Sequence, residues 1–150
     1  MITTATLSQH PFLHDMPEDQ LAALAACAQT LNFEPGEYLF KTGQVAARFF
    51  LVMEGTIAVS ASADPTALTL YTRGHGDALG WSWVFKDYQW RFTGKALTPV
   101  RVLAFEGECL RAMCEADLSF GYEFMKRIAW QLLHSLDATR LQVLDMFRNG

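Results

Sequence analysis

The sequence predicts an α+β fold, in which a small β-barrel or jelly roll of about eight strands lies between one N-terminal helix and a long C-terminal helix. Over about residues 31–106, short segments have apolar residues at every second position and are separated by turn residues. Over about residues 108–147, the apolar spacing changes to steps of three and four, which is typical of helices. Because 51% of the 150 residues are hydrophobic and 19% are charged, we expect a single domain over residues 1–150.

The first predicted element is a helix that covers a sheet. Asp15 stands in a capping position, Pro17 follows near the first turn, and Glu18 and Asp19 place acidic side chains where the helix dipole favours them. The apolar stripe of this helix consists of Leu21, Leu24, Ala25 and Ala28.

The strands begin near Leu31, where the apolar period becomes two. A strand, a turn and a second strand span residues 32–40, and a buried strand spans residues 48–53. Return strands follow at 56–60 and 68–72, and two more lie within residues 95–105. The turns between them are marked by Pro35 and Gly36, Gly43, Glu54 and Gly55, and Thr98 and Pro99.

The C-terminal part is predicted to be helical. A short helix covers residues 108–115, and Asp117 caps a helix over residues 118–147, which is roughly 45 Å long at 1.5 Å per residue. One apolar row has coiled-coil spacing: Met125, Ala129, Leu132, Leu136, Thr139, Val143 and Met146. A second row lies beside it: Phe124, Ile128, Leu133, Leu141 and Leu144. We predict a homodimer through this helix, the alternative being a single helix packed on its own domain.

Residues 74–94 carry the features that indicate a site. They hold three of the four tryptophans, with three glycines ahead of them and Arg91 beside the last one. A glycine turn that leads into the start of a helix leaves backbone N–H groups available to an anion. The aromatic side chains either stack on a flat ligand or fill a core, and both alternatives stay open.

Two motifs in the strand region carry a family resemblance. Residues 33–43 read FEPGEYLFKTG and residues 48–59 read RFFLVMEGTIAV, with turn glycines at Gly36, Gly43 and Gly55. Together with Gly76 and Gly80, they resemble the cyclic nucleotide-binding domain superfamily, in particular the sensor domains of catabolite activator-type bacterial regulators. The resemblance covers about residues 11–147. It implies a stand-alone regulatory module that senses a small effector in the barrel and signals through the long helix.

The resemblance also implies where an effector would bind, through an atypical phosphate-binding cassette. In the family, a glutamate after the glycine that matches Gly80 binds the ribose hydroxyl; here Trp81 stands in its place. The phosphate-binding arginine aligns with Trp90, and Arg91 follows one residue later. We therefore expect weak or absent cyclic AMP binding. The predicted ligand-binding residues are Gly80, Trp81, Ser82, Trp83, Trp90, Arg91, Phe92, Thr93 and, on the long helix, Thr139.

Other functions find little support in the sequence. The net charge of −4 and the absence of a recognition helix after residue 147 lead us to expect no DNA binding. No apolar run reaches the length of a membrane span, and no signal peptide begins the chain, so we expect a cytoplasmic protein. Ser82 lacks the glycine of a nucleophile elbow at Val84, so we predict no enzyme and no catalytic residue.

We likewise expect no metal site and no cofactor apart from a cyclic nucleotide or another small anionic effector. Cys27, Cys109 and Cys114 do not match a zinc or iron–sulfur spacing, and we expect them to be free thiols. Two functions follow from the sequence. The first is an effector-sensing regulatory module. The second is a degenerate domain whose pocket is filled by aromatic side chains and which serves dimerisation or partner docking.

Overall fold

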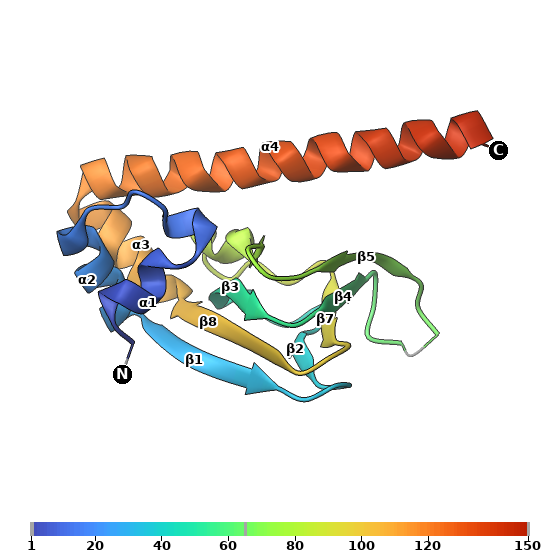
Figure 1. Ribbon diagram of the computed structural model, residues 1–150, viewed down its shortest axis with the longest axis horizontal. Coiled ribbons are helices and arrows are strands. Elements are labelled where there is room, and N and C mark those ends of the chain that lie inside the picture. Colours follow the sequence, from blue (N-terminus) through green and yellow to red (C-terminus); the bar gives the residue numbers. More distant parts are fainter. Residues whose placement is uncertain (1, 65, 150) are drawn as a thin grey trace. The chain divides into compact units, whose positions relative to one another are not determined.

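The structure is a computed structural model that describes residues 2–64 and 66–149. The chain forms two compact units, Met1–Met113 and Cys114–Gly150. The first unit contains the described strands, the helices that precede them and most of helix α3 (Gly107–Ala116), whereas helix α4 (Leu118–Asn149) makes up most of the second (Figure 1).

Three short helices stand where one was predicted. They are α1 (Thr4–Ser8), the 3₁₀ helix η1 (Pro11–Leu13) and α2 (Glu18–Ala26). The predicted cap at Asp15 is wrong: this residue has a φ of 62°, and Pro17 precedes α2 without a side-chain capping bond. The predicted stripe also extends too far, because α2 ends at Ala26 and Ala28 already pairs with Phe105 in a strand.

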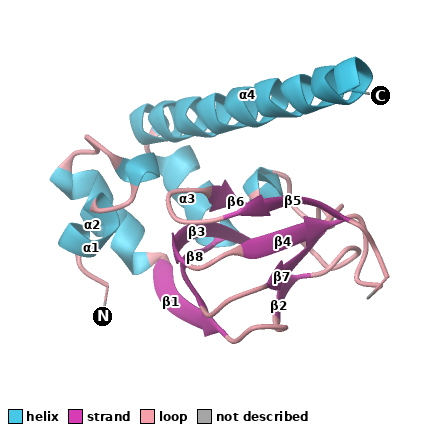
Figure 2. Cartoon of the chain, turned by 45° about the vertical axis from the view of Figure 1, so that its right-hand side comes forward, coloured by secondary structure: helices cyan, strands magenta, loops and turns pink. Residues whose placement is uncertain are grey.

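Within the described residues, eight strands form two four-stranded antiparallel sheets, which confirms the predicted jelly roll (Figure 2). In the first sheet the spatial order is β1 (Ala28–Phe33), β8 (Val100–Glu106), β3 (Arg48–Glu54) and β6 (Ala78–Leu79). In the second it is β2 (Tyr38–Phe40), β7 (Thr93–Ala96), β4 (Ile57–Ser60) and β5 (Thr69–Arg73). Sequence analysis did not predict β6, which is too short to show a period of two.

The core lies between the two sheets. Strand pairing places Phe50 opposite Ala104 and Val52 opposite Val102, so their side chains share the inner face. Ten buried residues make up this core: Phe40, Phe50, Val52, Ile57, Val59, Leu79, Ala96, Val100, Val102 and Ala104. The outer face of β3 is buried as well, because the Phe12 ring of η1 packs on Phe49 with 5.2 Å between ring centroids.

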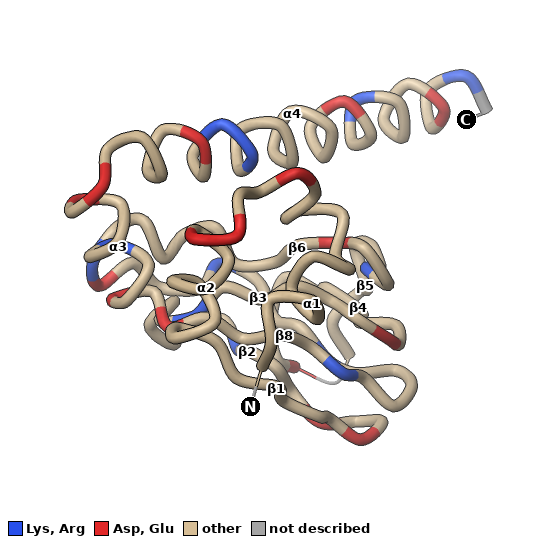
Figure 3. Tube along the Cα trace, turned by 60° about the vertical axis from the view of Figure 1, so that its left-hand side comes forward, with Lys and Arg blue, Asp and Glu red and all other residues tan. Residues whose placement is uncertain are grey.

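The C-terminal helices match their predicted bounds closely. The Asp117 carboxylate accepts hydrogen bonds from the backbone N–H groups of Ser119 and Phe120, at 3.1 and 3.2 Å, so the predicted cap of α4 is confirmed. Lys and Arg alternate with Asp and Glu along α4 (Figure 3). Within the described residues, no helix combines the length and the apolar character needed to cross a bilayer.

A disulfide corrects the prediction of three free thiols. Cys27, at the end of α2, is bonded to Cys109 in the first turn of α3, with 5.7 Å between their Cα atoms. Cys114 is a free thiol, and burial raises its pKa. The two bonded cysteines lie 82 residues apart in sequence, and the pairing of β1 with β8 brings them together, which cysteine spacing alone does not show.

Candidate functional site

The glycine-rich segment before the tryptophans is a turn that docks on β3. Gly74 donates its backbone N–H to the Asp77 carboxylate at 2.8 Å, which closes the turn. Val52 donates to the Asp77 carbonyl at 2.9 Å, and Gly76, with a φ of 88°, donates to the Val52 carbonyl at 3.1 Å. The turn therefore fixes the position at which β6 and the following tryptophan segment begin.

A buried histidine lies against this turn. His10 is almost inaccessible, and its Nδ1 accepts a hydrogen bond from the Phe12 backbone N–H at 3.1 Å. Burial lowers the His10 pKa from 6.5 to about 4, against a smaller opposing effect of the nearby backbone of Asp77 and Val52. The side chain is thus neutral at pH 7. His75 on the turn is exposed, and its Nδ1 lies 2.7 Å from the Met53 carbonyl oxygen.

The predicted helix start after Gly80 is a single 3₁₀ turn, η2 (Trp81–Val84). Gly80 is buried and has a left-handed backbone with a φ of 86°. A Cβ added at Gly80 would lie 2.6 Å from Cη2 of the Trp90 ring and 2.8 Å from the Arg48 carbonyl oxygen. Gly80 is therefore required both by its φ and by the close approach of the Trp90 indole.

Trp90 fills part of the space between the sheets. Its indole stacks on the Phe40 ring, with 3.9 Å between centroids and 12° between planes, and lies 6.3 Å from the Phe50 ring at 24°. It packs against the buried core. Trp90 is partly buried, and it also lines the hollow described below, so one part of the side chain packs in the aromatic cluster and another part faces the hollow.

Backbone hydrogen bonds hold Trp90 in this position. Its N–H donates to the Gln44 carbonyl at 2.7 Å, and its carbonyl accepts from the Gly43 N–H at 2.9 Å. Ala46 donates to the Tyr88 carbonyl at 2.7 Å, so residues 88–90 run beside residues 43–46 like an added strand. A segment tied by three such bonds holds the indole in place on its stack.

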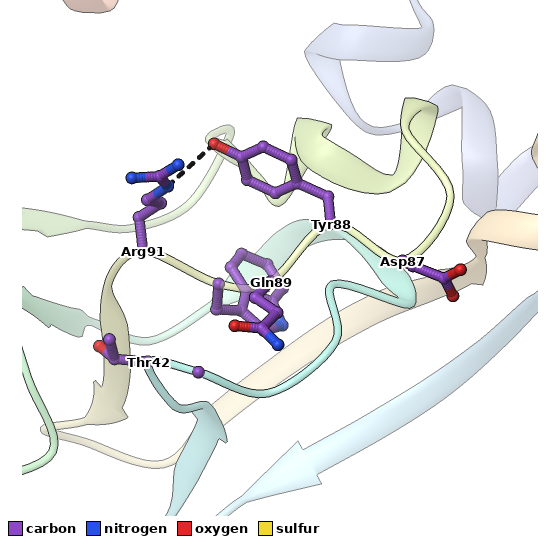
Figure 4. A pocket seen from close by; sticks show the side chains of 7 residues that line it. Thr42, Asp87, Tyr88, Gln89 and Arg91 are labelled. Atoms are coloured by element: carbon purple, nitrogen blue, oxygen red, sulfur yellow. Dashed lines mark hydrogen bonds between the residues drawn. The ribbon is translucent and has the colours of Figure 1, made fainter.

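Arg91 lies outside the barrel. Its Nε donates to the Tyr88 hydroxyl at 3.1 Å, and the guanidinium carbon lies 5.6 Å from the Tyr88 ring centroid. Figure 4 shows Arg91 and Tyr88 on the same side of a hollow of about 450 Å³. The hollow is lined by Thr42, Gly43, Asp87, Tyr88, Gln89, Trp90 and Arg91. Asp87 brings a negative charge to the same rim, so the hollow is not purely cationic.

Two of the other predicted residues lie close to this segment. Phe92 is exposed, whereas Thr93 is buried. The Thr93 hydroxyl accepts a hydrogen bond from the Thr42 backbone N–H at 3.0 Å and lies 2.9 Å from the Thr42 hydroxyl. It therefore serves to tie β7 to the loop after β2.

Residues of η2 contact β3 and α3. Trp83 is buried, and its ring lies 6.3 Å from the Phe49 ring. Arg111 of α3 donates a hydrogen bond to the Trp83 carbonyl. Trp81 and Ser82 are partly exposed, and the Ser82 carbonyl accepts from the Phe85 N–H at 3.0 Å. Trp83 thus belongs to the packing of the fold.

Thr139 belongs to the second compact unit. It lies on α4, and its hydroxyl donates to the Ser135 carbonyl at 2.9 Å within the same helix. Such a bond is a common local use of threonine in a helix.

Sequence analysis missed the residues that hold Trp90 in place. Phe40 stacks on the Trp90 ring, and Gly43 and Gln44 form hydrogen bonds with the Trp90 backbone. Tyr88 lines the hollow beside Trp90. Phe40 is the buried last residue of β2, and its stacking partner lies 50 positions later in the sequence, which no local pattern indicates. In the described part of the chain, no three His, Cys, Asp or Glu residues gather in a way that would hold a metal ion.

Comparison with known proteins identifies a family model that matches more than half of the chain. Residues 30–117 match the family model described as the cyclic nucleotide-binding domain. A cyclic nucleotide-binding protein of Geobacter metallireducens, described as putative, is 27% identical with a TM-score of 0.81, and the match covers 91% of this chain and 99% of that one. The N-terminal domain of a Streptomyces coelicolor transcriptional regulator is 25% identical with a TM-score of 0.68, over 88% of this chain and 95% of that domain.

The fold is also that of a larger regulator. The catabolite activator protein of Thermus thermophilus superimposes with a TM-score of 0.69 at 19% identity. The match covers 91% of this chain and 61% of that protein.

Proposed function

Since the chain belongs to the cyclic nucleotide-binding domain family, we propose that it is a regulatory module whose barrel is closed by its own Trp90 and that it does not take up cyclic AMP in the usual way. The single observation that supports this is the stack of Trp90 on Phe40, 3.9 Å apart, inside the barrel. Family resemblance aligns Trp90 with the phosphate-binding arginine, so an apolar ring lies where an anion would need a cation.

The second missing group is the ribose acceptor. An indole donates a hydrogen bond but does not accept one, so Trp81 cannot replace a glutamate. A buried hydroxyl left without its partner loses about 1–3 kcal/mol, and the loss of a charge-assisted phosphate contact costs about 1.5–3 kcal/mol more. Together these losses lower the affinity by roughly two to four decades.

The hollow beside Trp90 supports a second candidate function. Arg91, Tyr88 and Gln89 bring a guanidinium, a hydroxyl and an amide to its rim. A small anionic effector bound there would meet Arg91 and the edge of the Trp90 segment, which makes the module a sensor with a displaced site. In this alternative, Arg91 supplies the charge and Trp90 contributes apolar contact.

The output of the module is carried by α4. From Leu132 onward its apolar side chains are exposed: Leu132, Leu133, Leu136, Leu141, Val143, Leu144, Met146 and Phe147. A helix with such a row buries it against a partner, and a second copy of the chain supplies the same row. We propose a cytoplasmic homodimer joined through this helix, acting without catalysis.

Calorimetric titration of the purified protein with cyclic AMP and cyclic GMP tests the closed barrel. We expect no saturable binding below the millimolar range by the wild type, and a gain in affinity in the double variant Trp81→Glu with Trp90→Arg. Trp130→Phe on α4 is the matched control, because Trp130 is exposed and far along the chain from the barrel strands. Submicromolar cyclic AMP binding by the wild type would refute the proposal.

The displaced site has its own test. If a panel of small anions produces binding to the wild type, Arg91→Ala should abolish it while Lys86→Ala leaves it unchanged. Lys86 is a suitable control because it is an exposed cation on the same loop that does not line the hollow. Equal affinities in wild type and Arg91→Ala would contradict this second function.

A further inference from the structure

The disulfide joins two parts of the first unit that lie at opposite ends of its strand region. Cys27 is the last residue of the N-terminal helical segment, directly after α2. Cys109 lies in the first turn of α3, directly after the last strand. The bond therefore fastens the start of α3 to the N-terminal helices.

The two sulfur atoms are neighbours because of the strands and not because of the bond. Ala28 lies opposite Phe105 in the β1–β8 ladder, and the Glu106 N–H donates to the Cys27 carbonyl at 3.2 Å. The Cα separation of 5.7 Å lies within the range that a disulfide spans without backbone movement. A reduced pair would thus stay within reach of reoxidation.

The pair has one protected and one accessible sulfur. Cys27 is buried, and its sulfur lies 3.5 Å from the Met113 sulfur, whereas Cys109 is partly exposed. A thiol from solution therefore reaches the Cys109 sulfur first. Cys114 is the third cysteine, and burial together with Glu115 raises its pKa, which makes it a weak competitor for exchange.

The first turns of α3 contact the tryptophan segment. Gly107 donates to the Ala47 carbonyl at 2.7 Å, and a Cβ added at Gly107 would lie 2.8 Å from Cβ of Trp83. One turn later, Arg111 donates to the Trp83 carbonyl. Any loosening of α3 at Cys109 consequently affects the residues that pack on Trp83.

From these contacts we propose that Cys27 and Cys109 are a reversible thiol–disulfide pair, exchanged with small thiols and their disulfides, and that its redox state sets the rigidity of the first turns of α3. In the cytoplasm proposed above, where structural disulfides are rare and those present are usually transient or redox-sensing, the bond forms on oxidation. The proposal itself needs neither an effector nor a dimer.

Reduction of the Cys27–Cys109 disulfide proceeds in two steps. A small thiolate attacks the Cys109 sulfur, the bond between the two protein sulfurs breaks, and Cys27 leaves as a thiolate that takes a proton from water. A second small thiolate then attacks the outer sulfur of the mixed disulfide, which releases Cys109 and a small disulfide. Two electrons pass from the two small thiols to the protein, and oxidation by the small disulfide reverses both steps.

Thiol counting by mass spectrometry tests the pair in the full chain. The protein is equilibrated with glutathione disulfide or with excess glutathione, quenched in denaturant with an alkylating reagent, and weighed intact. We expect one label after oxidation, on Cys114, and three after reduction, since the chain has three cysteines. Three labels after oxidation, or glutathione adducts without an internal bond, would overturn the proposal.

Hydrogen exchange tests the consequence for α3. Reduction should speed amide exchange in residues 109–113 by at least about tenfold, because local opening loses its covalent restraint. The Cys114→Ser variant should respond like the wild type, and Cys109→Ser should exchange like the reduced protein in both buffers. Unchanged exchange in residues 109–113 on reduction would show that the bond has no conformational effect and would overturn that part of the proposal. Since the wild type alone gives this comparison, the test stands even if a variant fails to fold.

Discussion

Two adjacent residues, Trp90 and Arg91, have different surroundings in the structure. Side chains alternate in direction along an extended segment, so one of the two lies inside and the other outside. Here the indole lies inside on Phe40 and the guanidinium lies outside on Tyr88. The opposite register would place a cation inside the barrel and would favour a phosphate ligand there.

The fit between Gly80 and Trp90 can be measured with a pair of glycine substitutions. Gly36→Ala places a side chain at a φ of 93° with no atom within 4 Å, so it should cost only the conformational penalty, about 1 kcal/mol. Gly80→Ala has the same type of penalty and also meets the Trp90 ring at 2.6 Å, so we expect a further ~1–3 kcal/mol of destabilisation. Urea unfolding measures both.

If the two glycine variants lose the same free energy of unfolding relative to the wild type, the Trp90 indole moves aside at little cost. In that case Trp90 would behave as a displaceable side chain, and the effector-sensing function would gain support over the closed barrel.

Burial of His10 predicts a loss of stability in acid. Its pKa is about 4 in the folded protein and 6.5 when unfolded, so the unfolded chain binds the proton first as pH falls. The contribution is fully present above pH 6.5 and is lost between pH 6.5 and 4, by about 2 kcal/mol from pH 7 to pH 5. Chemical unfolding at these two pH values measures the loss.

The control for this prediction is His10→Asn. Asparagine keeps an acceptor for the Phe12 N–H but does not titrate, so the variant should lose less stability than the wild type over the same interval. The comparison isolates His10 from His75 and Asp77, which lie nearby and contribute to its pKa. If the variant and the wild type show the same pH dependence, the protonation of His10 is not the cause.

The exposed apolar side chains of helix α4 predict a homodimer. Leu136→Lys places a charge in the proposed seam, and burying it there is unfavourable, so we expect a folded monomer. Ala138→Lys is the matched control, because Ala138 is exposed on the same helix and belongs to neither apolar row. Light scattering after gel filtration measures the mass of each variant.

The wild type should elute as a dimer in that experiment, and so should Ala138→Lys. A wild-type protein that stays monomeric at high concentration rules out the homodimer.

Short elements depended on tertiary contacts more than long ones. The 32-residue helix α4 and its Asp117 cap were predictable because many apolar repeats and a cap signal coincide there. The helices α1 and η1, with five and three residues, carry no such repeat. Helices of this length are unstable alone, so their formation is decided by what they pack on, such as Phe12 on Phe49.

For the whole molecule, we predict that this chain does not bind DNA at micromolar concentration. Its formal net charge is −4, and acidic and basic residues are interspersed along the sequence. A mobility-shift assay at micromolar protein and low salt should show no complex. A salt-sensitive shift with this chain would contradict the prediction.

The amino-acid sequence by itself determined the fold class, the regions of strand and helix, and the family. These follow from the apolar period and from turn glycines such as Gly43 and Gly55, which are local properties of the chain.

Tertiary structure alone decided that Trp90 stacks on Phe40, that Thr93 binds Thr42, and that Cys27 meets Cys109. Each of these contacts joins residues about 50 or more positions apart. Strand pairing sets such contacts, because it fixes which faces meet and which residues lie opposite one another, and no local pattern of the sequence specifies that register.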